Sequence, residues 1–255
     1  MRVTRKGQLL QLSFMPRIFP VNCYLVEEED GLTLIDAALP YSAAGIIKAA
    51  EAVGKPLARI VLTHAHSDHI GALDALKTKF PELPVHISVR DARLLAGDTT
   101  LDPGEPQTPI RGGVPQPRKV ATRPDVLLKE GDRVGSLRVI ATPGHTPGSI
   151  SLLDTRSGAL IVGDALQTRG GVAVSGQLRP LFPFPALATW NAEAALASAW
   201  KLAALDAGLL AAGHGRMIER PADIMRAAIA QAERKLGALP GGGEGESGHV
   251  AKGGH

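Results

Sequence analysis

The run HAHSDH at residues 64–69 places three histidines and one aspartate within six positions. Imidazole nitrogen and carboxylate oxygen are ligands that zinc and similar metals prefer. In an extended segment, residues two positions apart point the same way, so His64 and His66 can bind one ion together. Asp68 and His69 begin the next predicted element and point elsewhere, towards a second ion nearby. The spacing therefore predicts a site for two metal ions.

Two predicted elements fix the ends of this run. The β-branched segment 59–63 (RIVLT) predicts a buried strand directly before the histidines. Ile70, Leu73 and Leu76 recur at helical spacing and predict a helix over 68–80, which stops before Pro81. A strand end and a helix start therefore hold the intervening loop in place, as a rigid scaffold must do for metal ligands.

Apolar runs and helical patterns recur along the rest of the chain. We predict further strands over 8–14, 22–27, 32–36, 85–88, 126–128, 137–142, 149–154, 159–162 and 209–212. We predict helices over 41–53, over 189–205 with Thr189 as its N-cap, and over 221–236. Because strands and helices occur in both halves, two sheets covered by helices are the natural packing.

Two segments interrupt this pattern. Residues from about 95 to 125 are rich in Pro and Gly and poor in apolar side chains, which predicts a loop over the active site. From Pro240 the chain is Gly-rich and cannot bury enough apolar surface to order itself. We therefore predict one catalytic domain over 1–239 and a flexible tail over 240–255.

The composition excludes several classes of protein. The chain has 255 residues, 44% of them hydrophobic, which is enough for a sizeable core. Its net charge of +3 and the lack of a long basic run give no reason to expect a nucleic-acid partner. No apolar stretch is long enough for a membrane span or a signal peptide, and Cys23, the single cysteine, is predicted to lie in the core. We expect a cytoplasmic protein that acts on a small molecule and that can form a homodimer.

The segment THAHSDHIG (63–71) resembles the HxHxDH signature of the metallo-β-lactamase superfamily. Three later segments resemble the remaining motifs of that family in the same order. They contain His145 in ATPGHTPGSISLL, Asp164 in ALIVGDAL and His214 in LLAAGHG. The resemblance covers residues 8–236 and implies an α/β fold, a four-layer αββα sandwich of two mixed sheets flanked by helices.

The resemblance also implies a complete set of metal ligands. In this set, His64, His66 and His145 bind the first metal, Asp68, His69 and His214 bind the second, and Asp164 bridges both. Zinc is the first expectation for the two divalent ions, with manganese, iron or cobalt as alternatives. The residues agree with this set, because each of the three later ligands follows a strand-like run beside a glycine, where the backbone can turn sharply.

Other histidines and aspartates fit the site less well. Asp132 and Asp154 also close strand-like runs, so position alone distinguishes Asp164 least of the predicted ligands. His86 stands in the middle of a predicted strand, where it would pack or form a hydrogen bond. His249 and His255 lie in the predicted tail and are not expected in the site.

The implied mechanism is hydrolysis. Two metals roughly 3.5–4 Å apart can share a hydroxide that acts as the nucleophile, and Asp68 would be the catalytic residue that orients it or moves a proton. The chain resembles the glyoxalase II-like and lactonase-like branch, which predicts a carboxylic ester, lactone or thioester as substrate. It departs from the first group at Ser149, where a histidine is usual, and from the lactonases by lacking a tyrosine shortly after Asp164.

Three other activities remain open for such a site. They are phosphodiesterase or nuclease activity, β-lactam hydrolysis, and redox chemistry at iron. The apolar segments 15–20 and 181–184 would favour an acyl or alkyl substrate if both line the cleft. Arg17, Arg111 or Arg169 could then contact a carboxylate.

Overall fold

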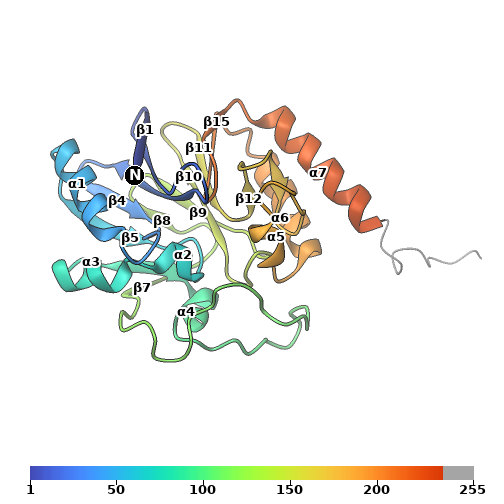
Figure 1. The fold of residues 1–255 in the computed structure, drawn as a ribbon, viewed down its shortest axis with the longest axis horizontal. Coiled ribbons are helices and arrows are strands. Elements are labelled where there is room, and N and C mark those ends of the chain that lie inside the picture. Colours follow the sequence, from blue (N-terminus) through green and yellow to red (C-terminus); the bar gives the residue numbers. More distant parts are fainter. Residues whose placement is uncertain (238–255) are drawn as a thin grey trace, which may run out of the picture.

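The computed structural model describes residues 1–237, so the tail predicted over 240–255 lies outside the described residues. In the described chain, two large mixed sheets face each other and helices cover both outer faces (Figure 1). These are the four layers expected from the sequence, and the predicted fold class is confirmed.

The first sheet is built from the N-terminal half. Its strands, in spatial order, are β1 (Arg2–Lys6), β2 (Leu9–Phe14), β3 (Val21–Glu27), β4 (Leu32–Ile35), β5 (Leu57–Val61), β6 (Val85–Ser88) and β7 (Val126–Leu128). Strands β1 to β4 pair antiparallel, whereas β4 to β7 pair parallel. The carboxyl end of β5 therefore delivers the HAHSDH loop to one edge of the sheet.

The second sheet is built from the C-terminal half. Its strands, in spatial order, are β15 (Ile218–Glu219), β14 (Leu209–Ala212), β11 (Ala159–Gly163), β10 (Ile150–Asp154), β9 (Leu137–Ala141) and β8 (Arg133–Val134). Strands β12 (Leu166–Gln167) and β13 (Ala173–Val174) form a separate pair. Because β11 and β14 are parallel neighbours, Asp164 and His214 leave the sheet at the same edge.

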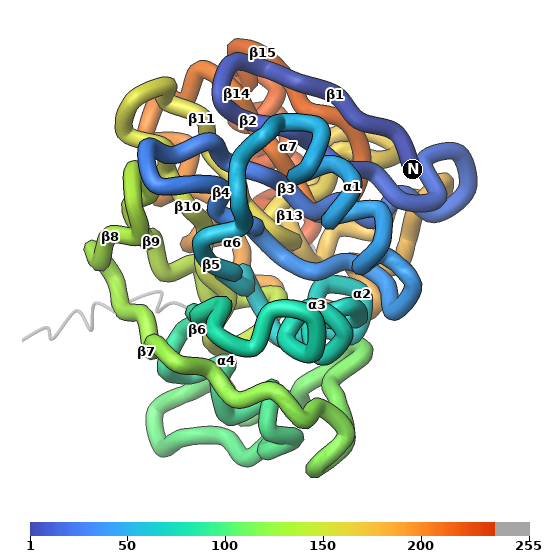
Figure 2. Tube along the Cα trace, turned by 90° about the vertical axis from the view of Figure 1, so that its left-hand side faces the viewer, coloured from blue at the N-terminus to red at the C-terminus, as the bar shows by residue number. Residues whose placement is uncertain are grey.

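Helices cover the outer faces of both sheets. They are α1 (Ala43–Val53), α2 (Ser67–Ile70), α3 (Leu73–Lys79), α4 (Val89–Leu95), α5 (Phe184–Leu187), α6 (Ala192–Ala203) and α7 (Ala222–Gly237). Figure 2 views the molecule from the outer side of the first sheet, with α1 and α3 in front of the strands. None of the helices in residues 1–237 has the length and hydrophobicity that a bilayer crossing requires.

Three hydrophobic clusters separate the four layers. Alternate side chains of a strand point to opposite faces. In β2, Leu10 and Leu12 belong to the cluster beneath α1 and α3, whereas Leu9 faces the second sheet. A third cluster, which includes Leu160 and Leu202, lies between the second sheet and the helices α6 and α7. The same alternation of apolar side chains therefore builds both outer interfaces and the central one.

The structure corrects several predicted elements. Strand β1 and helix α4 were not predicted. The helix predicted over 68–80 is two helices separated at Gly71, where a Cβ atom would lie 2.6 Å from the Ala38 carbonyl oxygen. The predicted N-cap Thr189 was wrong, because α6 starts at Ala192 and its N-cap is Asn191, which accepts a hydrogen bond of 2.8 Å from the Ala194 amide.

Polar side chains of the first sheet hold the loop that follows β14. The Tyr24 hydroxyl donates to the Ala212 carbonyl oxygen at 2.6 Å. The Asn22 amide donates to the carbonyl oxygens of Ala212 and Gly215 at 2.9 and 2.7 Å, and the Gln11 amide donates to that of Gly215 at 3.0 Å. These buried bonds fasten the loop of the final motif to the opposite sheet.

Substituting Tyr24→Phe leaves the ring in place but removes the bond to Ala212 and a 3.1 Å bond that the hydroxyl accepts from the Gln11 amide, which keeps Gly215 as its acceptor. We expect the free energy of unfolding to fall by about 1 kcal/mol, since the Ala212 carbonyl keeps the Asn22 amide as a donor. Denaturant unfolding measures the change. Tyr41→Phe is the matched control, because that side chain is 62% exposed. Equal unfolding midpoints for the two variants would contradict the role of the Tyr24 hydroxyl.

Candidate metal centre

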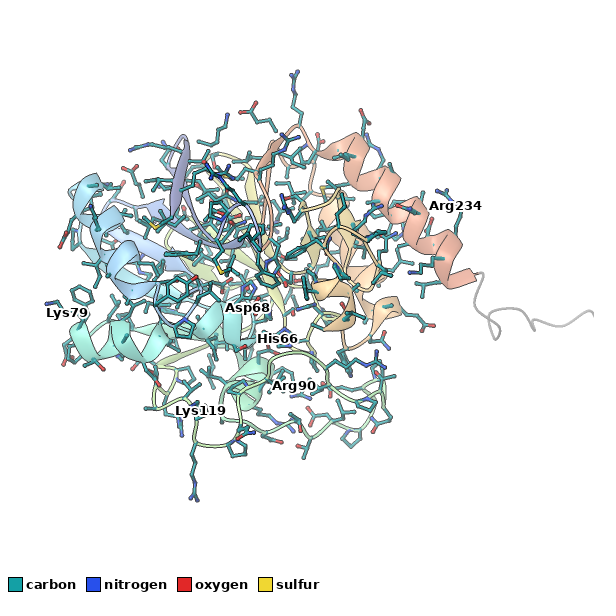
Figure 3. The ribbon with its side chains drawn as sticks, in the orientation of Figure 1. His66, Asp68, Lys79, Arg90, Lys119 and Arg234 are labelled. Atoms are coloured by element: carbon teal, nitrogen blue, oxygen red, sulfur yellow. The ribbon has the colours of Figure 1, made fainter. Side chains whose placement is uncertain are left out.

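The seven side chains predicted as ligands lie together at the common edge of the two sheets. They come from the loop after β5, the loop before β10, the end of β11 and the loop after β14. Within residues 1–237, their donor atoms form three groups, each within 4.8 Å: His64, His66 and His145; His64, His69 and Asp164; Asp68, His69 and His214. Figure 3 shows His66 and Asp68 near the centre of the molecule, beside α2.

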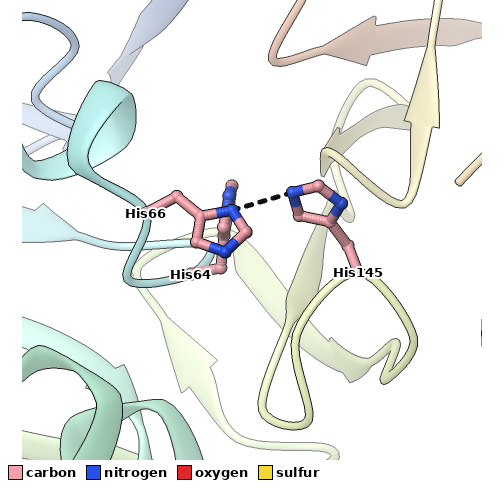
Figure 4. A group of neighbouring side chains, drawn as sticks. All are labelled: His64, His66 and His145. Carbon is pink, nitrogen blue, oxygen red and sulfur yellow. Dashed lines mark hydrogen bonds between the residues drawn. The ribbon is translucent and has the colours of Figure 1, made fainter. Parts of the chain in front are cut away.

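The first group consists of three buried imidazoles (Figure 4). His66 and His145 approach from different loops, and the His66 Nδ1 and His145 Nε2 atoms are 2.9 Å apart. The Nε2 atom of His64 is buried without a hydrogen-bond partner. Three nitrogens from two sheets therefore point into one small volume.

Backbone carbonyls determine the protonation of two of the rings. His66 Nε2 lies 2.9 Å from the Arg111 carbonyl oxygen, and His214 Nδ1 lies 2.7 Å from that of Pro20. A carbonyl oxygen only accepts hydrogen bonds, so both nitrogens carry the proton. In the neutral rings, His66 Nδ1 and His214 Nε2 therefore present lone pairs to the interior.

The other three rings are oriented by side chains. The outer Nδ1 atom of His69 lies 2.8 Å from Asp36 Oδ2. That of His64 lies 3.0 Å from Thr63 Oγ1, and that of His145 lies 3.0 Å from Ser175 Oγ. The hydroxyl protons of Thr63 and Ser175 are donated elsewhere, to Asp36 and to the Asp164 carbonyl oxygen. Both hydroxyl oxygens therefore accept from the imidazoles. In the neutral form, each of the five rings thus directs an unprotonated Nε2 or Nδ1 inwards.

This arrangement leaves acceptors facing acceptors. His64 Nε2, His69 Nε2 and Asp164 Oδ1 are buried and have no hydrogen-bond partner. Asp164 Oδ2 lies 3.4 Å from His145 Nε2 and 3.1 Å from His214 Nε2. Buried acceptors without donors are costly, and divalent cations are the natural partners for nitrogen and carboxylate donors. The residues present therefore fit the metal site that the sequence predicts.

The electrostatics differ between the two sides of the cluster. Burial lowers the pKa of His64 and His145 well below the ordinary value, which keeps these rings neutral as metal ligation requires. Burial also opposes charge on His69 and His214. There the carboxylates of Asp164 and Asp68, joined by that of Asp36 for His69, outweigh burial and raise the pKa of both rings. Negative charge is thus in excess on this side, where a cation would be favoured.

The metal-ligand cluster opens into a cavity of about 280 Å³. Asp68 is its most accessible ligand, with 27% of the side chain exposed. The opposite wall is apolar and contains Phe19, Phe184 and Leu187. Phe19 and Phe184 come from the two apolar loop segments singled out in the sequence, and their ring centroids are 4.8 Å apart.

The long segment between α4 and β7 also reaches this cavity through Gly112 and Gly113. A Cβ atom at Gly112 would lie 2.5 Å from the His66 ring, and one at Gly113 would lie 2.4 Å from Ser67 Oγ. Gly112 also has a left-handed φ of 88°, so a side chain there would be strained and would displace the His66 ring. Arg111, considered in the sequence as a carboxylate-binding residue, contacts the site through its backbone carbonyl oxygen.

Two positioning carboxylates were missed in the sequence. Asp36 accepts hydrogen bonds from the Thr63 amide and hydroxyl and from His69. Its φ of 60° at the end of β4 is unusual for a residue other than glycine, but the sequence does not reveal it. The second carboxylate, Asp91, lies at the start of α4, where acidic residues are common for reasons unrelated to a site.

Asp91 joins the two loops that supply the first group of imidazoles. Its buried carboxylate accepts from the Ala65 amide at 3.0 Å, from the Thr146 hydroxyl at 2.8 Å and from the Gly148 amide at 2.8 Å. Burial, opposed by these donors, raises its pKa to about 6. One side chain thus ties the HAHSDH loop to the loop of His145.

The remaining sequence alternatives lie elsewhere. Asp154 pairs with Arg156, and Asp132 accepts from the Lys129 amide in a turn. His86 is half-buried on β6 and is not among the grouped metal donors of residues 1–237. Cys23 is fully buried in the core, as predicted.

A family model described as the metallo-beta-lactamase superfamily matches residues 16–214. The chain belongs to the metallo-β-lactamase superfamily. Its relatives within the superfamily include metallo-hydrolases, and the chain is a metal-dependent hydrolase. Together with the histidine and aspartate donors described above, this membership supports binding of divalent metal.

Individual relatives resemble the chain over most of its length. The uncharacterized protein YobT of Bacillus subtilis is 56% identical over 234 residues, which cover 92% of this chain and 100% of YobT. The probable metallo-hydrolase YflN of the same organism is 33% identical over 214 residues, 76% of this chain and 80% of YflN. Among solved structures, the crystal structure of TTHA1623 in a di-iron-bound form matches with a TM-score of 0.60 and 27% sequence identity. The match covers 84% of this chain and 96% of the TTHA1623 chain.

A further relative has an activity in its name. The acyl-coenzyme A thioesterase MBLAC2 of Gallus gallus is 34% identical over 168 residues, which cover 57% of this chain and 57% of the relative.

Substituting Asp36→Asn tests the positioning of the His69 ring. The neutral amide has no second acceptor oxygen and no charge, so it holds the ring less firmly. We expect metal affinity to fall by about 10- to 100-fold, measured as metal bound at equilibrium in competition with a chelator. Asp206→Asn, at an exposed turn, is the control. An Asp36 variant that binds metal as tightly as this control would refute the assigned role.

Proposed function

We propose that this protein hydrolyses a carboxylic ester, lactone or thioester at a centre of two divalent ions, with zinc as the first candidate. The main support for this substrate class is the apolar wall opposite the candidate ligands, which is formed by Phe19, Phe184 and Leu187. Such a wall fits an acyl group and gives no counter-charge to a phosphodiester. The thioesterase named among the relatives supports an acyl substrate.

Seven residues would hold the ions, as the resemblance implied: His64, His66 and His145 the first, Asp68, His69 and His214 the second, and Asp164 both. The position of Asp164 supports its shared role, because its carboxylate oxygens lie within 3.4 Å of His69, His145 and His214 nitrogens. When bound, the ions lower the pKa of water and polarise a carbonyl oxygen. Iron is an alternative occupant, supported by the di-iron form of TTHA1623.

The chain's own residues divide the remaining work. The Asp68 carboxylate opens to the cavity and lies 3.5 Å from His214 Nε2, so it can accept a proton from the attacking water and pass it to the leaving oxygen or sulfur. Phe19 and Phe184 exclude water and orient the acyl chain. Gly112 and Gly113 let the backbone of the long segment approach His66 and Ser67 closely.

Metal removal combined with a substrate panel tests the proposal. We expect a chelator to remove metal and activity together, and Zn²⁺, Mn²⁺ or Co²⁺ to restore both. The panel contains an acyl thioester, an aryl ester, a lactone, a β-lactam and a phosphodiester, assayed at equal metal content. Turnover is expected for the three acyl substrates. Full turnover by metal-free protein, or hydrolysis of the phosphodiester alone, would refute the assignment.

Substituting Phe184→Ala tests the apolar wall. The ring is half exposed, so its loss removes part of the contact with an acyl chain. We expect kcat/KM for a hexanoyl substrate to fall about tenfold relative to an acetyl substrate. Leu178→Ala, an exposed apolar residue that does not line the cavity, is the control. A Phe184 variant with an unchanged hexanoyl-to-acetyl ratio would show that the acyl chain lies elsewhere.

A further inference from the structure

A second cavity, of about 370 Å³, lies directly beside the metal centre. The residues that line it include three arginines, Arg2, Arg169 and Arg216, and no acidic residue. We call it the arginine cavity. None of the three arginines forms an ion pair within residues 1–237, whereas arginines such as Arg90 and Arg156 are paired with carboxylates. The arginine cavity therefore concentrates positive charge without compensation from the chain.

The backbone connects this cavity to the metal cleft. Phe19 lines the cleft and its neighbour Pro20 lines the arginine cavity. In the same way, His214 lines the cleft, while the following Gly215 and Arg216 line the arginine cavity. The two cavities therefore adjoin along these two short segments.

The cavity walls are held in place. The Arg169 guanidinium donates to the Arg17 carbonyl oxygen at 2.8 Å, and the Arg169 amide donates to the His214 carbonyl oxygen at 3.2 Å. Gly215 has a φ of 104°, and a Cβ atom there would lie 2.4 Å from the Arg169 amide nitrogen. The cavity is thus shaped by the same backbone that positions His214.

A fourth arginine lies behind the glycine wall. The Arg179 Nε atom is buried without a hydrogen-bond partner, and it lies 3.9 Å from the position of a Cβ atom on Gly171. Gly170 and Gly171 line the cavity with left-handed φ angles of 73° and 104° and carry no side chain to fill it. Guanidinium groups gathered without carboxylates repel one another, and an anion relieves that repulsion.

We propose that the arginine cavity binds a phosphate group on the leaving portion of the substrate. The substrate class is then an acyl thioester whose thiol carrier is phosphorylated, an inference that rests on the proposed function. Phosphate fits better than a single carboxylate, because its charge and its several acceptor oxygens match more than one guanidinium. In the reaction, water cleaves the bond between carbonyl carbon and sulfur. Its oxygen goes to the acid and a proton goes to the thiol.

Two thioesters with the same acyl group test the proposal in the metal-loaded enzyme. One carries the acyl group on coenzyme A, which is phosphorylated, and the other on N-acetylcysteamine, which is not. We expect kcat/KM to favour the first by about tenfold or more. The exposed side chain of Arg216 makes the decisive variant, because Arg216→Ala removes charge with little effect on packing.

In Arg216→Ala, the preference for the phosphorylated thioester should fall about tenfold, with the other thioester unchanged. Arg234→Ala is the charge-matched control, since Arg234 lies on the outer helix α7 (Figure 3). An unchanged preference in Arg216→Ala overturns the proposal. An equal loss on both thioesters also overturns it, because it indicates a structural role.

Direct binding separates this inference from the proposed function. Adenosine 3′,5′-bisphosphate is titrated into the metal-loaded enzyme, and we expect Arg216→Ala to raise its Kd about tenfold. If the Kd rises as expected while neither thioester is hydrolysed, the anion site is supported and the proposed reaction is refuted. If both thioesters are hydrolysed equally well and the Kd is unchanged, the reaction stands and the anion site fails. If the bisphosphate binds at the metals instead, its Kd should be the same in Arg216→Ala, and this result would also refute the anion site.

Discussion

The hydrogen bonds on the outer nitrogens of five buried histidines determine how the rest of the site is built. Each outer nitrogen meets an acceptor, so each ring in its neutral form turns an unprotonated nitrogen inwards. Those nitrogens and the Asp164 carboxylate then face one another at the buried end of the cavity. Without cations the arrangement is unfavourable, and with them every donor is satisfied. The free energy of metal binding is therefore coupled to that of folding.

Two of these acceptors are backbone carbonyls from loops that also line the cavities. The Arg111 carbonyl belongs to the long segment that supplies Gly112 and Gly113, and the Pro20 carbonyl follows Phe19 in the loop between the two cavities. The position of each loop is thus coupled to the orientation of the histidine ring that its carbonyl contacts. A displacement of either loop would reach a metal-binding nitrogen through a single hydrogen bond.

The candidate metal ligands could be named from the sequence because only a few side chains can perform ligation, and because glycine and strand-like runs mark where they project. The groups that accept hydrogen bonds from the outer histidine nitrogens could not be found in this way. Any residue can supply a carbonyl as Pro20 and Arg111 do, and Asp36 looks like any carboxylate at a strand end. The order of layers followed from alternating apolar residues, but the break at Gly71 depends on the close approach of Ala38, which lies far away in the sequence.

The two sheets meet at the metals in a way that neither half could achieve alone. The HAHSDH loop extends from the first sheet, whereas His145, Asp164 and His214 leave the second. Each proposed ion would therefore have ligands from both sheets and act as a cross-link between them. The hydrogen bonds of Tyr24, Asn22 and Gln11 to the His214 loop already hold the same junction, within a largely apolar interface. Because those bonds need no metal, they can bring the ligand loops into register before the ions bind.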